Sequence, residues 1–319
     1  MNVLITLNIP EAGIELLKKE GLQVDVWRHD TPMTPQELVE KCQNFQALLT
    51  TGIDSINKDF LQKCTHLNII SQFGAGYDNI EVIEARKLGI AVGNAPDAMT
   101  DATADIAFAL MLAASRKICY LHKSILTDEW GFFSPRAHLG LELKGMTLGI
   151  FGMGRIGFEM AKRCQGAYQM KVIYCNRSIN SKGEQDLGAG KVSFDELLEQ
   201  SDILSVHCAL NSETRFVFNA GAFQKMKDTA LFINTSRGLV HQQDDLYQAL
   251  ISGTIWGAGL DVTDPEPMRP DDPLLFLENV AITPHIGSAT IQARDEMSRQ
   301  AAQNIIQYYR GDRVVNLVN

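Results

Sequence analysis

Short runs of β-branched and other apolar residues alternate with amphipathic helical patterns along almost the whole chain, and this alternation constrains the fold more than any other feature. One helix is predicted to begin after Thr34, because proline follows this cap residue and Glu37 completes a capping box. The strands expected in the first part of the chain are Val3–Leu7, Val24–Trp27, Ala47–Leu49, Asn68–Ser71 and Ile90–Val92. Strands that alternate with helices in this way form a parallel, doubly wound sheet.

A second series of strands and helices follows a break in the pattern. Met99–Arg116 is a long apolar helical segment, and the stretch Trp130–Leu143 is irregular. The strands expected after it are Thr147–Phe151, Lys171–Tyr174, Lys191–Phe194, Ile203–His207, Ala230–Asn234, Gly257–Val262 and Val280–Thr283. A final helix, about Ala289–Tyr309, is long enough to return to the first domain.

We therefore predict an α/β protein with two doubly wound, Rossmann-like domains and an active-site cleft between them. The first domain is expected to comprise residues 1–98 and 287–319, and the second residues 99–286, with an arm at about 115–145.

Composition excludes several classes of protein. The chain has 319 residues, of which 45% are hydrophobic and 21% charged, as in ordinary globular proteins. A net charge of −9 argues against nucleic-acid binding, and no apolar run approaches the roughly 20 residues that span a membrane. The six cysteines form no C-x-x-C pair, which favours reduced thiols in a cytoplasmic protein. The histidines lack metal-ligand spacing, so no metal site is expected.

A G-x-G-x-x-G loop directly follows the strand at 147–151 and opens a helical pattern. Gly152 allows a tight turn, Gly154 lets the backbone approach a pyrophosphate, and Gly157 lets the helix pack closely on the strand. Arg155 and Ile156 begin that helix, whose free N–H groups face the anion. An incidental glycine-rich turn is the alternative, but the strand and helix around the loop favour dinucleotide binding.

The residues that close the next strand indicate which dinucleotide binds. NAD-binding domains carry a carboxylate there, which holds the ribose 2′-hydroxyl. This chain instead has Asn176, Arg177 and Ser178. An arginine suits a 2′-phosphate because it offers several donors and a fixed charge. We therefore expect NADP(H) to be preferred over NAD(H); a solvated surface arginine is the alternative.

Three polar residues follow strands in the second half of the chain, where open α/β sheets place their ligands. Arg237 follows the strand at 230–234, Glu266 lies between two prolines after the next strand, and His285 follows the last one. Each residue taken singly has an ordinary structural explanation. Together they offer a cation for a carboxylate, a proton donor and a carboxylate to orient that donor.

Together with the glycine loop, the segments N-T-S-R-G (234–238), G-L-D-V with E-P (259–267) and P-H-I-G-S-A-T (284–290) resemble the D-isomer-specific 2-hydroxyacid dehydrogenase family. They look most like its glyoxylate/hydroxypyruvate reductase branch, and the resemblance covers nearly the entire chain. It implies that Arg237 binds the substrate carboxylate and polarises the adjacent carbonyl. It also implies that His285 exchanges a proton with the carbonyl oxygen, while Glu266 hydrogen-bonds the imidazole and favours its protonated form.

The resemblance assigns further roles by position. Gly74, Ala75 and Gly76 would offer backbone N–H groups to the substrate carboxylate. The other expected cofactor contacts are Thr103, Leu210, Thr214, Thr235, Asp261 and Gly287, of which Asp261 would meet the nicotinamide carboxamide. The arm implies a homodimer, and the sequence Trp130–Pro135 leaves open which aromatic side chain could approach the partner's active site.

The activity expected from the resemblance is NADPH-dependent reduction of glyoxylate to glycolate and of hydroxypyruvate to D-glycerate. One alternative keeps this chemistry for another substrate, such as phosphoglycerate, D-lactate or a bulkier 2-keto acid. A second alternative is a non-catalytic, dinucleotide-sensing scaffold of the same fold.

Overall fold

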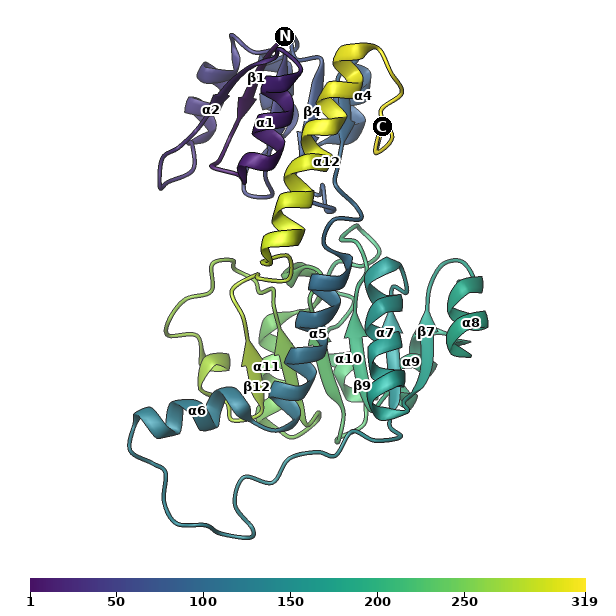
Figure 1. The fold of residues 1–319 in the computed structure, drawn as a ribbon. Helices are drawn as coiled ribbons and strands as arrows, with labels where there is room; N and C mark the ends of the chain where they lie inside the picture. Colours follow the sequence, from purple (N-terminus) through teal and green to yellow (C-terminus); the bar gives the residue numbers. More distant parts are fainter. The chain divides into compact units, whose positions relative to one another are not determined.

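The computed structural model describes all residues from Met1 to Asn319, and they divide into two units (Figure 1). Unit 1 contains Met1–Met99 and Ser288–Asn319, and unit 2 contains Thr100–Gly287. The C-terminal helix therefore belongs to the same unit as the N-terminus.

Unit 1 is built on five parallel strands in the order β2-β1-β3-β4-β5. The strands are β1 (Asn2–Ile5), β2 (Gln23–Val26), β3 (Ala47–Thr50), β4 (Ile69–Gln72) and β5 (Ala91–Gly93). Helices α1 (Glu11–Lys19) and α12 (Ile291–Arg310) cover one face, and α2 (Pro35–Cys42), α3 (Lys58–Lys63) and α4 (Val82–Lys87) cover the other. Successive strand residues face opposite layers, so Leu49 packs into the first core and Leu48 into the second.

Helices α1 and α12 lie side by side although they stand at opposite ends of the sequence (Figure 1). Gly13 allows this approach, because a Cβ there would lie 2.2 Å from the carbonyl oxygen of Ser298. The Gly13 N–H also donates to Ser298 Oγ at 3.0 Å. A small residue in α1 thus fixes where α12 crosses the first domain.

Unit 2 is built on seven parallel strands in the order β12-β11-β10-β9-β6-β7-β8. The strands are β6 (Thr147–Phe151), β7 (Lys171–Cys175), β8 (Gly190–Lys191), β9 (Ile203–Val206), β10 (Leu231–Asn234), β11 (Gly257–Leu260) and β12 (Val280–Ile282). Helices α5 (Thr100–Ser115) and α7 (Arg155–Tyr168) pack into one core with the sheet, and α9 (Phe194–Gln200), α10 (Ala220–Lys225) and α11 (Gln243–Ile251) pack into the other. Helix α8 (Ser181–Leu187) and the short 3₁₀ helices η1 (Gly238–Val240) and η2 (Pro273–Phe276) complete the unit.

The predicted fold class is confirmed, with two parallel α/β sheets and no closed barrel. The capping box at Thr34 and Glu37 is also present. The prediction of a strand over Lys191–Phe194 was wrong at its C-terminal end. The strand stops at Lys191, because Ser193 caps α9 and forms a capping box with Glu196.

Helix α6 (Ile118–Leu126) and the irregular segment after it carry an exposed apolar surface. Helix α6 has no buried residue at all. The side chains of Trp130, Phe132 and Phe133 are 79%, 93% and 87% exposed. No helix of the chain is both long and apolar enough to cross a membrane.

Candidate active site

The three polar residues predicted for catalysis lie at the carboxyl edge of one sheet. Arg237 follows β10, Glu266 follows β11 and His285 follows β12. These strands are neighbours and run parallel, so their carboxyl ends meet at the same edge. The structure therefore brings together three residues that are separated by up to 48 positions in the sequence.

Glu266 and His285 form the central pair of this edge. Glu266 Oε1 lies 3.1 Å from His285 Nδ1, and the two side chains are 40% and 48% exposed. Such a contact fixes the orientation of the imidazole ring. It leaves the other ring nitrogen, Nε2, to exchange a proton with a bound molecule.

The loop that carries His285 is held by Asp261, which is only 1% exposed at the end of β11. One oxygen of its carboxylate accepts hydrogen bonds from Thr283 Oγ1 at 2.6 Å and Ile286 N at 2.8 Å, and the other accepts from Gly287 N at 2.7 Å. His285 itself adopts a φ of 52°, which is uncommon for a residue with a side chain. Asp261 thus fixes the conformation of the turn that carries the imidazole of His285.

The turn that carries Arg237 is organised by a residue that sequence reasoning did not single out. Asn234 is fully buried, and its amide nitrogen donates to the Arg237 carbonyl at 2.9 Å. Its amide oxygen accepts from the backbone N–H and the hydroxyl of Ser236 at 2.9 and 2.8 Å. An asparagine at a strand end followed by a turn is the sequence signal that could have revealed it.

Gly238 is the residue at which the Arg237 turn packs against the Glu266 loop. A Cβ at this position would lie 1.9 Å from the carbonyl oxygen of Thr263 and 2.2 Å from its carbonyl carbon. Only glycine lets the two backbones approach so closely. The glycine of N-T-S-R-G therefore sets the spacing between the arginine and the loop of the carboxylate.

The glycine loop after β6 makes a tight turn and leads directly into α7, whose N-terminus has no side-chain cap. Gly152 has a φ of 92°, and a Cβ there would lie 2.7 Å from Cys208 N. A Cβ at Gly157 would lie 2.9 Å from Gly152 O and from Ile150 Cγ2. Gly154 precedes α7 and supplies no side-chain cap. This geometry agrees with the predicted reasons for Gly152 and Gly157, while the approach of a pyrophosphate to Gly154 stays a prediction.

Comparison with known proteins identifies the family. Residues 108–287 match the NAD binding domain of the D-isomer specific 2-hydroxyacid dehydrogenases. The chain is 42% identical to a glyoxylate reductase of Thermococcus litoralis over 321 residues, covering 99% of this chain and 96% of that protein. The chain belongs to the D-isomer specific 2-hydroxyacid dehydrogenase family.

Two further relatives bear on the substrate and cofactor. A D-3-phosphoglycerate dehydrogenase of Archaeoglobus fulgidus is 37% identical over 100% of this chain, which covers 59% of that protein. The crystal structure of an NADPH-dependent glyoxylate/hydroxypyruvate reductase from Sinorhizobium meliloti, in complex with NADP and malonate, matches with a TM-score of 0.86 at 27% identity. That match covers 99% of this chain and 96% of the other.

Membership makes the protein an NAD(P)-dependent oxidoreductase that acts on a small 2-hydroxy or 2-keto acid. The glycine loop fits the nicotinamide dinucleotide. Side chains at Gly152 or Gly157 would clash with neighbouring backbone, and the N-terminus of α7 is left without a side-chain cap for an incoming phosphate. The hydroxyl of Thr235 adds a buried polar atom without a partner in the protein.

The three cofactor residues predicted at the end of β7 differ in their contacts and in their exposure to solvent. The Asn176 side chain turns back to the glycine loop, where Oδ1 accepts from Met153 N at 2.7 Å and Nδ2 donates to Met153 O at 3.0 Å. Arg177 and Ser178 are exposed. Lys191, which was not predicted from the sequence, lies on the neighbouring strand β8. Its Nζ donates to the Arg177 carbonyl oxygen at a distance of 3.5 Å. The Asn176 side chain thus supports the glycine loop, and its contact with the cofactor stays a prediction.

The remaining predicted residues lie in several places. Thr103 is 5% exposed and donates from its hydroxyl to Gly287 O at 3.2 Å, which ties α5 to the His285 loop. Thr214 donates to Ala209 O at 2.8 Å in the loop that also contains the part-buried Leu210. Gly74, Ala75 and Gly76 belong to unit 1, where they follow β4. In that turn Gly74 O accepts from Ala95 N and Ala75 O from Asn94 Nδ2, both at 2.8 Å.

Proposed function

We propose that this protein reduces glyoxylate to glycolate and hydroxypyruvate to D-glycerate with NADPH. The observation that carries the proposal is the 3.1 Å contact between Glu266 and His285, on the same sheet edge as Arg237. The glyoxylate reductase of T. litoralis and the reductase structure from S. meliloti support this choice of substrate.

The proposed chemistry follows from the charges and donors at the sheet edge. Arg237 holds the carboxylate of the 2-keto acid and polarises its carbonyl group. A nicotinamide dinucleotide held by the glycine loop would supply the hydride that the carbonyl carbon accepts. His285 Nε2 donates a proton to the carbonyl oxygen, and Glu266 stabilises the imidazolium before that transfer. In the reverse direction His285 takes the proton from the hydroxyl group.

The two units are assigned different tasks. We assign residues 1–98 and 287–319 to substrate binding, with backbone N–H groups of Gly74, Ala75 and Gly76 directed to the substrate carboxylate. Residues 99–286 are assigned to the dinucleotide. The glycine loop holds its pyrophosphate, and the cofactor cleft is lined by Thr103, Leu210, Thr214, Thr235, Asp261 and Gly287.

NADPH is preferred in this proposal because the end of β7 carries cations in place of a carboxylate. Arg177 and Ser178 are exposed, and the Lys191 side chain reaches the same loop. Two cations and a hydroxyl suit a 2′-phosphate, whereas a 2′-hydroxyl needs an acceptor. The NADP in the S. meliloti structure is consistent with this preference.

A homodimer is part of the proposal. The arm at about 115–145 exposes Trp130, Phe132 and Phe133, together with the apolar side of α6. Exposed large apolar side chains that gather in one segment of the chain are typical of a subunit interface. Light scattering coupled to size exclusion should give twice the chain mass, and a monomer at micromolar concentration would contradict the interface.

The decisive experiment is an initial-rate panel of glyoxylate, hydroxypyruvate, pyruvate and phenylpyruvate, each with NADPH and with NADH. We expect the highest kcat/KM for the first two acids with NADPH. His285→Ala should lose about 10²- to 10⁴-fold in kcat, because the proton donor is removed. The exposed His29→Ala serves as the matched control. Near-normal turnover by His285→Ala, or equal efficiency with NADH, would refute the corresponding assignment.

The runner-up substrate is a phosphorylated 2-keto acid, which the phosphoglycerate dehydrogenase of A. fulgidus suggests. Adding phosphohydroxypyruvate to the panel separates the two: a kcat/KM above that for hydroxypyruvate would favour this alternative. Tight NADPH binding without any turnover would favour a sensing scaffold.

A further inference from the structure

His241 is a fully buried histidine that directly follows η1 in unit 2. Its backbone N–H donates to Gly238 O at 3.1 Å, and its ring packs edge-on against Phe232, with 5.7 Å between the ring centroids. Burial lowers the pKa of His241 to about 4, so the imidazole is neutral at the pH of ordinary assays. A neutral imidazole carries one ring proton, and the position of that proton decides which hydrogen bonds the ring can make.

The side-chain amide of Asn234 has its orientation fixed by the turn around Arg237. Its Oδ1 accepts from the backbone N–H and from the hydroxyl of Ser236, at 2.9 and 2.8 Å. Its Nδ2 donates to Arg237 O at 2.9 Å. A flipped amide would place two donors against each other at Ser236 and two acceptors against each other at Arg237. The nitrogen of this amide is therefore the atom that faces His241.

The Asn234 amide nitrogen in turn determines the tautomer of His241. Nδ2 carries two hydrogens; one is donated to Arg237 O, and the other faces His241 Nδ1 at an N···N distance of 3.0 Å. Nδ1 must therefore be unprotonated and accept, which leaves the ring proton on Nε2. His241 Nε2 is buried and has no hydrogen-bond partner in the protein. Because an unpaired buried donor destabilises a fold, the Nδ1 contact calls for a functional explanation.

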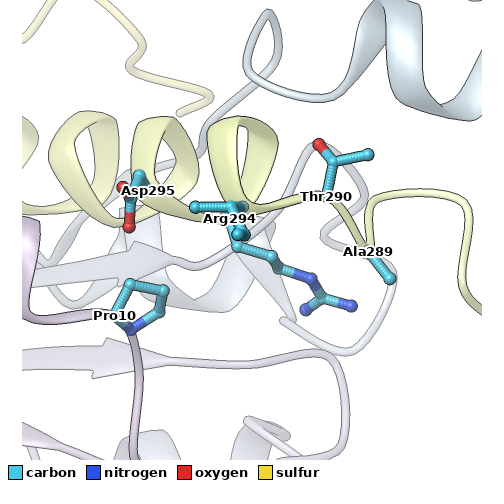
Figure 2. A pocket seen from close by; sticks show the side chains of 6 residues that line it. Pro10, Ala289, Thr290, Arg294 and Asp295 are labelled. Atoms are coloured by element: carbon cyan, nitrogen blue, oxygen red, sulfur yellow. The ribbon is translucent and has the colours of Figure 1, made fainter.

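The unpaired N–H of His241 is not assigned to a ligand. The pocket of about 360 Å³ at the start of α12 is formed by residues of unit 1 (Figure 2). Its lining residues are Pro10, Ala289, Thr290, Ile291, Arg294 and Asp295. His241 belongs to unit 2 and exposes none of its surface. Its ring therefore acts on its protein neighbours, of which Asn234 is the polar one.

We propose that His241 is a positioning residue for Arg237 and acts through Asn234. Its Nδ1 accepts the second amide hydrogen of Asn234, and this holds the amide in the orientation that binds both Ser236 and the Arg237 carbonyl. The inference rests on the proposed function, in which Arg237 holds the substrate carboxylate. All four residues belong to unit 2, and His241 is assigned no contact with the substrate.

The kinetic test removes the acceptor and then restores it. In His241→Leu the second amide hydrogen of Asn234 has no acceptor, so the amide is free to rotate and the Arg237 turn loosens. We expect kcat/KM for glyoxylate with NADPH to fall about 10- to 100-fold and KM for the acid to rise. The dissociation constant of NADPH should change by less than about threefold. His241→Asn, whose Oδ1 takes the place of Nδ1, should stay within about threefold of the wild-type kcat/KM.

Two controls separate positioning from a general loss of stability. Leu250→Ala lies in the same apolar core as Phe232 and removes no hydrogen bond, so it should lower the melting temperature and leave kcat/KM within about twofold. In an Asn234→Ala background, His241→Leu should change kcat/KM by less than about twofold, because the residue through which it acts is already missing. A His241→Leu enzyme within about threefold of the wild-type kcat/KM, or an equal loss in both backgrounds, would overturn the inference.

A spectroscopic arm needs no turnover and separates this inference from the proposed function. Nitrogen-15 spectra of the full chain report which ring nitrogen of His241 carries the proton, and His241→Asn assigns the signals. We expect Nε2–H in the wild-type protein, and backbone amide signals of Ser236 and Arg237 that shift in His241→Leu.

The outcomes of the two arms are distinct. If no 2-keto acid is reduced, the proposed function fails. A proton on Nδ1 of His241, or Ser236 and Arg237 amide signals that do not move in His241→Leu, rejects the inference by itself. The tautomer is measured on the wild-type protein, so it decides the inference even if His241→Leu does not fold.

Discussion

Replacing Gly238 with alanine should damage the active site without removing any functional group. The new Cβ would lie 1.9 Å from Thr263 O, whereas ordinary van der Waals contact begins at 3.4 Å. The Arg237 turn and the Glu266 loop must therefore separate by about 1.5 Å. Both contacting atoms belong to backbone, so no side-chain rotation can relieve the overlap.

The expected loss follows from that displacement. A misplacement of about 1 Å between catalytic groups costs on the order of 10²-fold in rate. We expect Gly238→Ala to lower kcat/KM for glyoxylate by about 100-fold and to destabilise the fold by roughly 1–3 kcal/mol through overpacking. Nucleotide affinity should remain within about threefold, because the glycine loop on β6 is not involved.

The assay is initial-rate kinetics at a temperature where circular dichroism shows both proteins folded, with NADPH binding measured in parallel. Gly166→Ala is the control, since this glycine lies within α7 and a Cβ there meets nothing within 4 Å. That change should leave the rate unaltered and slightly raise stability. A Gly238→Ala enzyme within threefold of the wild-type rate would refute the claim that this close approach positions Arg237.

Two further predictions concern the groups behind the site. Burial lowers the pKa of His241 to about 4, so the folded state binds fewer protons than the unfolded state between about pH 6.5 and pH 4. Its contribution to stability is complete above pH 6.5 and falls by about 2–3 kcal/mol by pH 4.5. The free energy of unfolding, measured with urea at pH 7.5 and 4.5, should fall less in His241→Gln than in the wild-type protein. The glutamine can still accept the hydrogen bond from Asn234. An identical pH dependence of stability in the wild-type and variant proteins would contradict this prediction. The Asp261 carboxylate accepts three hydrogen bonds through its two oxygens, whereas the amide in Asp261→Asn offers only one acceptor oxygen. We therefore expect kcat to fall at least tenfold in Asp261→Asn while NADPH still binds. An unchanged kcat would show that the His285 turn does not depend on this carboxylate.

The alternation of apolar and helical segments was enough to predict both parallel sheets. Their strands are buried on both faces, so each appears as a short apolar run between helical patterns. The cap residues also predicted helix boundaries, as at Thr34. The prediction failed at β8, where two residues pair with β7 and the apolar Phe194 begins a helix. A strand of that length leaves too little pattern to separate it from the helix that follows.

The sequence also identified Arg237, Glu266 and His285 as candidates, because each follows a strand that must end at the same edge of a parallel sheet. It could not show the distance between Glu266 and His285, since that depends on loop conformation. Nor could it reveal that Asn176 supports the glycine loop, or that Asp261 holds the His285 turn with both carboxylate oxygens. A side chain's partner is decided by which backbone groups the folded loops bring within hydrogen-bond distance.

Local sequence pattern thus determined the elements, their order and the positions of the candidate residues, because these depend on periodicity and on strand ends. Tertiary structure decided the spacing of the Arg237 turn and the Glu266 loop at Gly238. That spacing depends on atoms that are distant in the sequence, and no local pattern records how closely such atoms approach.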